Sequence, residues 1–274
     1  MGLLARLGAS LRRPPPPIAD ALWHRAMAAC PLARRLDPGR QARLRECAAW
    51  FLARKSFSAV AGAELDDLRR LLIALQATLP VLELGVQALR GWREVIVYPG
   101  EFKVQRSHED AAGVITEGDE VLVGEAWERG PLILSWADVA TDLAQPWDGF
   151  NVVAHEIAHK LDMLDGAADG VPELPRTLSR RAWIAALQAA FDRHVRAVER
   201  GHRIAIDAYA AEGADEFFAV VSELHFSDPA PLVRAEPEVA ALLTAYYGPA
   251  PGAGRAAQPG LKRTTKRAPP SSGE

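Results

Sequence analysis

The sequence has few cysteines and no long apolar run. Its 274 residues include only two cysteines, Cys30 and Cys47. A secreted domain stapled by disulfides usually contains more, so we expect two free thiols in a reducing cytoplasm. No apolar stretch reaches the roughly 20 residues of a membrane span, and the first 13 residues lack the apolar core of a signal peptide. The sequence therefore predicts a cytoplasmic protein without a membrane partner.

A strong overall charge is also absent. The formal net charge is −3, with 24% charged and 49% hydrophobic residues, a composition typical of a folded globular protein. The charge is unevenly distributed, because residues 251–274 carry five basic residues against one acid, which leaves −7 for the rest of the chain. We interpret the basic segment as a solvated tail and expect no nucleic-acid partner.

Proline, glycine and basic residues concentrate at the two ends of the chain. We expect a disordered Pro/Arg-rich N-terminus over residues 1–17 and a disordered basic tail over residues 249–274. The segment between them, residues 18–248, is long enough to bury a full core and is expected to form a single domain.

Helical periodicity occupies both ends of this expected domain. Apolar residues recur at helical spacing over 38–55 and 63–90, and Pro80 should kink or divide the second segment. Further helices are predicted over 179–200, 215–226 and 236–247, the first stopped by a glycine and the second before a proline.

Short β-prone runs lie in the middle of the chain, at 95–98, 121–123 and 132–136. The order is helical over 18–91, sheet over 92–137 and helical again over 138–248. It predicts an α+β, zincin-like fold in which a small, mostly antiparallel sheet lies beside the active-site helix. Gly130–Trp136 is the candidate edge strand for pairing with an extended substrate.

The most informative motif is the sequence HEIAH at residues 155–159. Residues four apart share one helical face, so His155 and His159 can bind a single Zn²⁺, and Glu156 between them can act as a general base on water. Asp148 or Asn151 can cap the start of this helix.

The rest of this helix carries an apolar stripe that should pack inward. The helix is expected to end at Gly166. The stripe consists of Val153, Ile157, Leu161 and Leu164.

A catalytic zinc needs a third protein ligand, and the spacing leaves several candidates. A ligand six residues after the second histidine would be Asp165, but that pattern requires glycine where this chain has Asp162. A glutamate from a later helix is the other source. The candidates are Glu199, Glu212, Glu216 and Glu223. Glu216 and Glu223 share a helical face but lie about 10 Å apart along the axis, so one would be a ligand and the other an outer partner or a surface charge.

Several segments accompany the motif: HEIAHKLD at 155–162, DG at 165–166, GVP at 170–172, IDAYAA at 206–211, EFFAVVSE at 216–223, LPVLELG at 79–85 and VYP at 97–99. Together they resemble the Mlc titration factor A family of zinc peptidases, over roughly residues 20–248.

The resemblance implies a set of site residues and partners. Zinc would be held by His155, His159 and the matching Glu216, with Glu156 activating water and Tyr209 as the active-site tyrosine. It implies a cytosolic peptidase of aminopeptidase type acting on a peptide or protein substrate. It also implies binding to an Mlc-type transcriptional repressor. The alternative is a regulator-binding protein in sugar-uptake control whose peptidase activity is secondary.

Other residues near the motif have two interpretations each. Asp162 either orients a ligand imidazole or is a surface residue, and Asp207 is either functional or a turn former. Trp136 and Trp147 are expected to pack in the core. The remaining histidines are expected at the surface or satisfied by hydrogen bonds: His24, His108, His194, His202 and His225.

Overall fold

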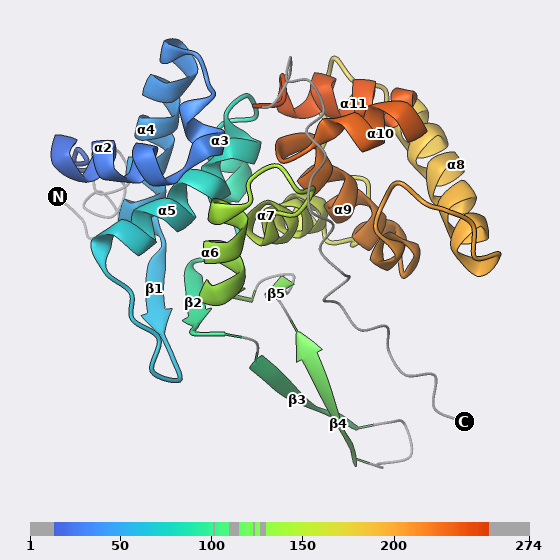
Figure 1. Cartoon of the computed structure of the whole chain (residues 1–274), viewed down its shortest axis with the longest axis horizontal. Coiled ribbons are helices and arrows are strands. Elements are labelled where there is room, and N and C mark those ends of the chain that lie inside the picture. The colour runs from blue at the N-terminus through green and yellow to red at the C-terminus, as the bar shows by residue number, and fades with distance from the viewer. Residues whose placement is uncertain (1–13, 101, 110–114, 123, 127–129, 252–274) are drawn as a thin grey trace, which may run out of the picture.

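The computed structural model describes residues 14–100, 102–109, 115–122, 124–126 and 130–251 (Figure 1). The predictions of disorder for residues 1–13 and 252–274 therefore lie outside the described residues. Within the described part of the chain, no helix combines the length and apolar character that crossing a bilayer requires.

The N-terminal part is helical, as predicted. It contains α2 (Asp20–Ala29), α3 (Pro31–Arg34), α4 (Pro38–Arg54) and α5 (Asp67–Thr78). The carboxylates of Asp37 and Asp66 accept the backbone N–H of the residue three positions on and thereby cap α4 and α5. The predicted division at Pro80 is confirmed, because the chain leaves α5 at Thr78 and continues as η1 (Leu79–Val81) and η2 (Val86–Leu89).

The sheet is mostly parallel, so the prediction of a mostly antiparallel sheet is wrong. Its order is β1 (Ser56–Ala59), β2 (Glu94–Tyr98), β6 (Leu132–Ser135) and β5 (Gly124–Ala126). Strands β1, β2 and β6 run parallel, and only β5 pairs antiparallel, with β6.

Two connections explain this topology. Between β1 and β2 the chain passes through α5, which gives the long crossover that parallel neighbours require. Between β2 and β6 it forms β3 (Phe102–Glu109) and β4 (Ile115–Leu122), which pair with each other. Strand β1 was not predicted, because residues 18–91 were expected to be helical. Its sequence SFSA contains two serines and lacks the apolar run of a typical strand.

The prediction of Gly130–Trp136 as an edge strand is also wrong. Strand β6 lies between β2 and β5, and all four of its residues are buried. Strands that are covered on both faces read as continuous apolar runs, as the LIL of β6 does. Trp136 begins the next helix, α6 (Trp136–Ala144), whose first turn is capped by the Ser135 hydroxyl.

Helix α7 (Val152–Asp162) carries the HEIAH motif, and all 11 of its residues are buried. Oδ1 of Asn151 accepts the N–H of Ala154 at 2.8 Å, so Asn151 is the cap, whereas Asp148 accepts from Phe150 in the preceding turn. The helix tightens into η3 (Met163–Asp165) and ends at Gly166, whose φ of 96° confirms the predicted stop.

The predicted apolar stripe of α7 does pack inward. Val153, Ile157 and Leu161 are fully buried, and Leu164 is partly buried against the same core. The helix packs against α5 and α6 and against strands β5 and β6.

Three C-terminal helices follow the predicted segments closely: α8 (Arg180–Glu199), α9 (Ala214–Phe226) and α11 (Pro237–Tyr247). The short η4 (Ala208–Ala211) before α9 and the helix α10 (Pro229–Ala235) after it were not predicted. In Figure 1 these C-terminal helices form the orange side of the molecule and α2–α5 the blue side, with α7 between the two. Because α9 packs directly on α7, side chains more than 50 residues apart meet at this contact.

The two cysteines are free, as predicted. Cys30 and Cys47 are both buried, and burial raises the pKa of each thiol to about 11. Their thiols are therefore protonated and unreactive at neutral pH.

Candidate metal centre

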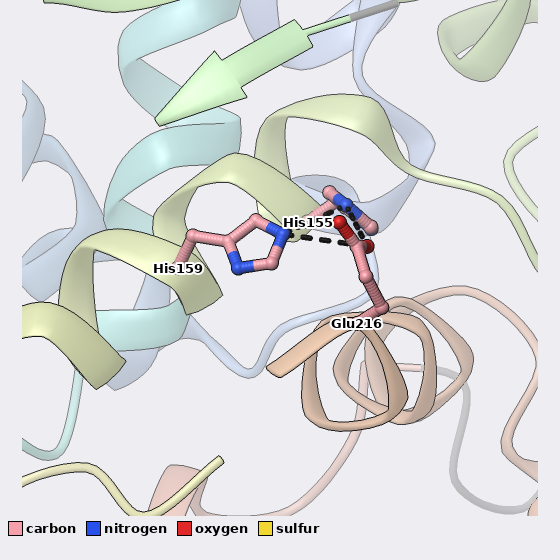
Figure 2. Close-up of side chains that lie close together, drawn as sticks. All are labelled: His155, His159 and Glu216. Atoms are coloured by element: carbon pink, nitrogen blue, oxygen red, sulfur yellow. Dashed lines mark hydrogen bonds and ion pairs between the residues drawn. The ribbon is translucent and has the colours of Figure 1, made fainter. Parts of the chain in front are cut away.

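Three side chains from α7 and α9 converge on one point (Figure 2). Nε2 of His155 lies 3.1 Å from Nε2 of His159, and both face Oε2 of Glu216, at 3.2 Å and 3.5 Å. The histidines are one helical turn apart, so their rings project from the same face of α7. Glu216 reaches them from the first turn of α9.

This triangle fits a single metal ion. Three ligand atoms at the 2.0–2.1 Å bond lengths of tetrahedral zinc are separated from one another by about 3.3 Å. The observed separations, 3.1 to 3.5 Å, bracket that value. Oε2 of Glu216 is also buried and makes no hydrogen bond within the described part of the chain, as expected of an oxygen reserved for a cation.

The structure separates the candidates for the third ligand. Among the described residues, His155, His159 and Glu216 form the one group able to hold a metal. Asp165 is exposed in η3 and lies 3.7 Å from Arg180, while Glu199 and Glu212 are exposed. The fourth glutamate, Glu223, is buried on the other side of His155.

The charge balance at Glu216 favours its ionised form. Burial opposes the charge, but the favourable interaction with the two adjacent imidazoles outweighs it and holds the pKa of Glu216 well below its usual range. The centre therefore offers one negative carboxylate and two ring nitrogens.

Tyr209 contacts the same carboxylate. Its hydroxyl donates to Oε1 of Glu216 at 3.0 Å. The tyrosine is carried by η4, which Asp207 caps by accepting the N–H of Tyr209 at 2.9 Å, while Nε2 of His194 lies 2.9 Å from the Asp207 carbonyl oxygen. Of the two interpretations of Asp207, the turn former is the one that these contacts support.

Glu156 is buried in α7, between the two histidines, with 1% of its surface exposed. Four residues on, Lys160 is also buried and donates to the carbonyl of Gly130 at 3.0 Å. Burial lowers the pKa of Lys160 to about 8, and the nearby Glu156 carboxylate partly offsets this effect. Glu156 thus lies in a largely dry environment that contains a cationic neighbour.

Asp162 is fully buried, which excludes the surface interpretation. Its Oδ2 accepts the N–H of Gly170 at 2.8 Å, and burial raises its pKa to about 7 although that hydrogen bond opposes the shift. Within the described residues, Oδ1 of Asp162 and Nδ1 of His159 make no hydrogen bond. The predicted orienting contact to an imidazole is therefore not formed by Asp162.

An orienting contact is instead made by a residue whose role the sequence left open. Oε1 of Glu223 lies 2.7 Å from Nδ1 of His155. The one available signal was the seven-residue spacing from Glu216, which places both glutamates on one face of α9.

The predictions for the other histidines and for the two tryptophans are confirmed where the structure describes their side chains. His24 and His202 are exposed, and His194 and His225 bond backbone carbonyls, while the side chain of His108 lies outside the described residues. Trp136 and Trp147 pack against the core, and an arginine lies over each ring.

These contacts define a class of protein, one that can hold a metal ion between an HExxH helix and a glutamate of a second helix. Residues 8–248 match the family described as glucose-regulated metallo-peptidase M90. The chain therefore belongs to this metallopeptidase family.

Individual relatives agree with that assignment. The chain is 42% identical to Mlc titration factor A of Salmonella arizonae over 215 residues, which cover 77% of this chain and 84% of the relative. The corresponding protein of Klebsiella pneumoniae is 40% identical over 77% of this chain and 79% of its own length. That of Escherichia fergusonii is 38% identical over 86% and 87%. The resemblance predicted from the sequence motifs is thus confirmed.

Proposed function

We propose that the chain is a zinc-dependent, cytoplasmic peptidase of aminopeptidase type, with residues 18–248 forming one zincin-like domain. The observation that carries the proposal is the triangle of His155 Nε2, His159 Nε2 and Glu216 Oε2, with sides of 3.1 to 3.5 Å. Membership of a metallopeptidase family supports the same reaction class. The aminopeptidase type rests on the resemblance of the sequence motifs alone.

His155, His159 and Glu216 would hold the metal. Two imidazoles and one carboxylate are the ligand set of many catalytic zinc sites, and they leave a position open for chemistry. When bound, Zn²⁺ supplies Lewis acidity, which favours deprotonation of water near neutral pH.

Glu156 and Tyr209 would carry the proton transfer and the charge stabilisation. Glu156 accepts a proton from the attacking water and delivers it to the leaving amine. Tyr209 would redirect its one hydroxyl proton from Glu216 to the oxyanion that develops on the scissile carbonyl. Its hydroxyl already lies beside the centre, where it contacts Oε1 of Glu216 at 3.0 Å.

The Glu156→Gln variant tests this proposal. The amide keeps the size of the side chain but cannot accept a proton, so we expect one zinc per chain, as in the wild type, and peptide cleavage reduced by about 10²- to 10⁴-fold. Metal content is measured by mass spectrometry and cleavage with unblocked dipeptides. Equal cleavage by the variant and the wild type would exclude this mechanism.

The aminopeptidase type has its own test. If the enzyme removes N-terminal residues, a peptide with a free α-amino group should be cleaved, whereas the same peptide with an acetylated N-terminus should not. Equal cleavage of both peptides, or cleavage at an internal bond, contradicts the aminopeptidase type and leaves the zinc mechanism intact.

A second candidate function is binding of an Mlc-type transcriptional repressor. It is favoured by the name Mlc titration factor A of relatives that are 38–42% identical over most of this chain. Calorimetric titration with a purified repressor of this type should detect a complex. If Glu156→Gln binds the repressor like the wild type, binding and catalysis are separable. If the wild type shows no heat of binding, this function is excluded.

A further inference from the structure

The imidazole of His155 is contacted at both nitrogens by glutamates of the same helix, α9. Nε2 lies 3.2 Å from Oε2 of Glu216, and Nδ1 lies 2.7 Å from Oε1 of Glu223. The glutamates are two helical turns apart, so α9 extends past the ring on both sides. Glu216 belongs to the proposed metal centre, whereas Glu223 does not.

The second oxygen of Glu223 is also engaged. Oε2 accepts the backbone N–H of Asn151 at 2.7 Å, at the point where Asn151 begins α7. The Asn151 side chain is held in turn by Gln76 of α5, since Nδ2 donates to Oε1 of Gln76 at 2.9 Å. Glu223 is 2% exposed, so these contacts are made away from water.

These contacts favour one tautomer of His155. Both oxygens of the Glu223 carboxylate are placed as acceptors, Oε2 for the N–H of Asn151 and Oε1 for Nδ1 of His155, so Nδ1 is the ring nitrogen that donates in this arrangement. In the neutral imidazole the lone pair then lies on Nε2, the atom that faces His159 and Glu216. A metal can bind only that lone pair.

We propose that Glu223 is a positioning residue that fixes both the tautomer and the ring orientation of His155 for metal binding. The proposal rests on the proposed function, because it takes His155 as a ligand. Helix α9 then supplies one ligand to the metal and also orients a second ligand from α7. Glu223 thereby links the packing of α7 on α9 to the affinity of the centre for a metal ion.

Glu223→Gln is the sharpest variant, because an amide has only one acceptor oxygen for two donors. If that oxygen accepts from Asn151, the amide NH₂ faces Nδ1 of His155 and requires the proton on Nε2, where it blocks the metal. If the amide is reversed, the NH₂ opposes the N–H of Asn151. Either arrangement should weaken zinc binding by about 10- to 100-fold.

The matched control is Ser227→Ala, one helical turn further along the chain. The Ser227 hydroxyl accepts the N–H of Gly149 at 3.0 Å and donates to the Pro146 carbonyl at 3.0 Å, so it also ties the end of α9 to the segment that leads into α7. It is buried but does not belong to the metal centre. We expect the control to lose thermal stability and to keep the zinc affinity of the wild type within about threefold.

The experiment measures zinc affinity by competition with a chromophoric chelator, on full-length protein shown to be folded by circular dichroism. Proton–nitrogen spectra of the zinc-loaded protein provide the second readout. In the wild type and in Ser227→Ala, the Nδ1 proton of His155 should resonate far downfield because its acceptor is a carboxylate. In Glu223→Gln this signal should move upfield or vanish.

The outcomes separate the two proposals. If the wild type binds no zinc, the proposed function fails. If the wild type binds zinc but Glu223→Gln binds it equally well, or Ser227→Ala loses as much affinity, only the positioning role is overturned. If Glu223→Gln does not fold, Glu223→Asp keeps the charge but shortens the side chain. It should bind zinc about tenfold more weakly, and an unchanged affinity overturns the positioning role.

Discussion

The hydroxyl of Tyr209 donates a hydrogen bond to Oε1 of Glu216 at 3.0 Å, while Oε2 of the same carboxylate faces the two imidazoles. The two oxygens of Glu216 therefore have different partners. Because Oε1 is occupied by the phenol, only Oε2 is directed at the point where a metal would sit. The Tyr209 contact thus favours a one-oxygen geometry for Glu216, and the Tyr209 hydroxyl lies beside the proposed metal centre.

Tyr209→Phe should separate metal binding from catalysis. The variant keeps the aromatic ring and removes the donor, so we expect kcat for peptide cleavage to fall by about 10²-fold, as for the loss of one oxyanion donor. Zinc affinity should change by less than about tenfold, because one hydrogen bond is worth about 1 kcal/mol. Steady-state kinetics and chelator competition measure the two effects. A variant with the kcat of the wild type would show that the phenol takes no part in the reaction.

Removing the third ligand should have a larger effect on metal content. Glu216→Ala takes away one of the three proposed ligands and should weaken zinc binding by more than about 100-fold, beyond the range of outer-sphere partners. Asp165→Ala is the control, since it removes a carboxylate that is close to the motif in sequence. This carboxylate is exposed and lies 3.7 Å from Arg180. We expect the control to purify with one zinc per chain. Loss of zinc from Asp165→Ala and not from Glu216→Ala would reverse the ligand assignment.

The helices that the sequence predicted correctly have local signals. Caps such as Asn151 and stops such as Gly166 lie next to the segments they bound, and the periodicity of α7 is contained in its own residues. Strand pairing is not local. The parallel order of β1, β2 and β6 depends on α5 and on the β3–β4 hairpin, and nothing within those short runs records their direction.

The same distinction applies to the candidate site. His155 and His159 follow from a four-residue spacing, whereas the choice of Glu216 over Asp165 came from family resemblance and not from geometry. The contact of Glu223 with Nδ1 of His155 depends on how α9 lies against α7, so the sequence left this glutamate with an unassigned role.

Gly170 is expected to be a sensitive position for stability. Its φ is +77°, and a Cβ there would lie 2.7 Å from the carbonyl oxygen of Ala214 at the start of α9. Its N–H is donated to Asp162 and its carbonyl accepts from Nε1 of Trp183, so the backbone cannot shift without losing these bonds. Gly170→Ala should therefore lower the free energy of unfolding by about 2 to 4 kcal/mol.

Gly201→Ala is the control for Gly170→Ala. Its φ is also positive, at +62°, but no atom lies within 4 Å of its added Cβ. It should cost about 1 kcal/mol, from backbone strain alone. Urea titration of both variants measures the difference, and equal losses would show that the approach to Ala214 is not what constrains Gly170.

The acid sensitivity of the fold should depend on His225. This side chain is 2% exposed in α9, and its Nε2 lies 3.1 Å from the Gly248 carbonyl. Burial, with a small contribution from Arg40 and opposed by the Gly248 bond, lowers its pKa from 6.5 to about 4. Between pH 6.5 and 4 the unfolded chain therefore binds a proton that the folded chain does not. As the pH is lowered through this window, the free energy of unfolding therefore decreases, by up to about 3 kcal/mol from this residue.

His225→Gln should remove that part of the pH dependence. Glutamine can donate to the same carbonyl but does not titrate. Between pH 7 and pH 4 the variant should therefore lose less unfolding free energy than the wild type. The exposed His202 gives the control, since His202→Gln should keep the pH profile of the wild type. Urea titrations at several pH values measure these profiles. Parallel profiles for His225→Gln and the wild type would mean that His225 takes up its proton equally in the folded and unfolded chains.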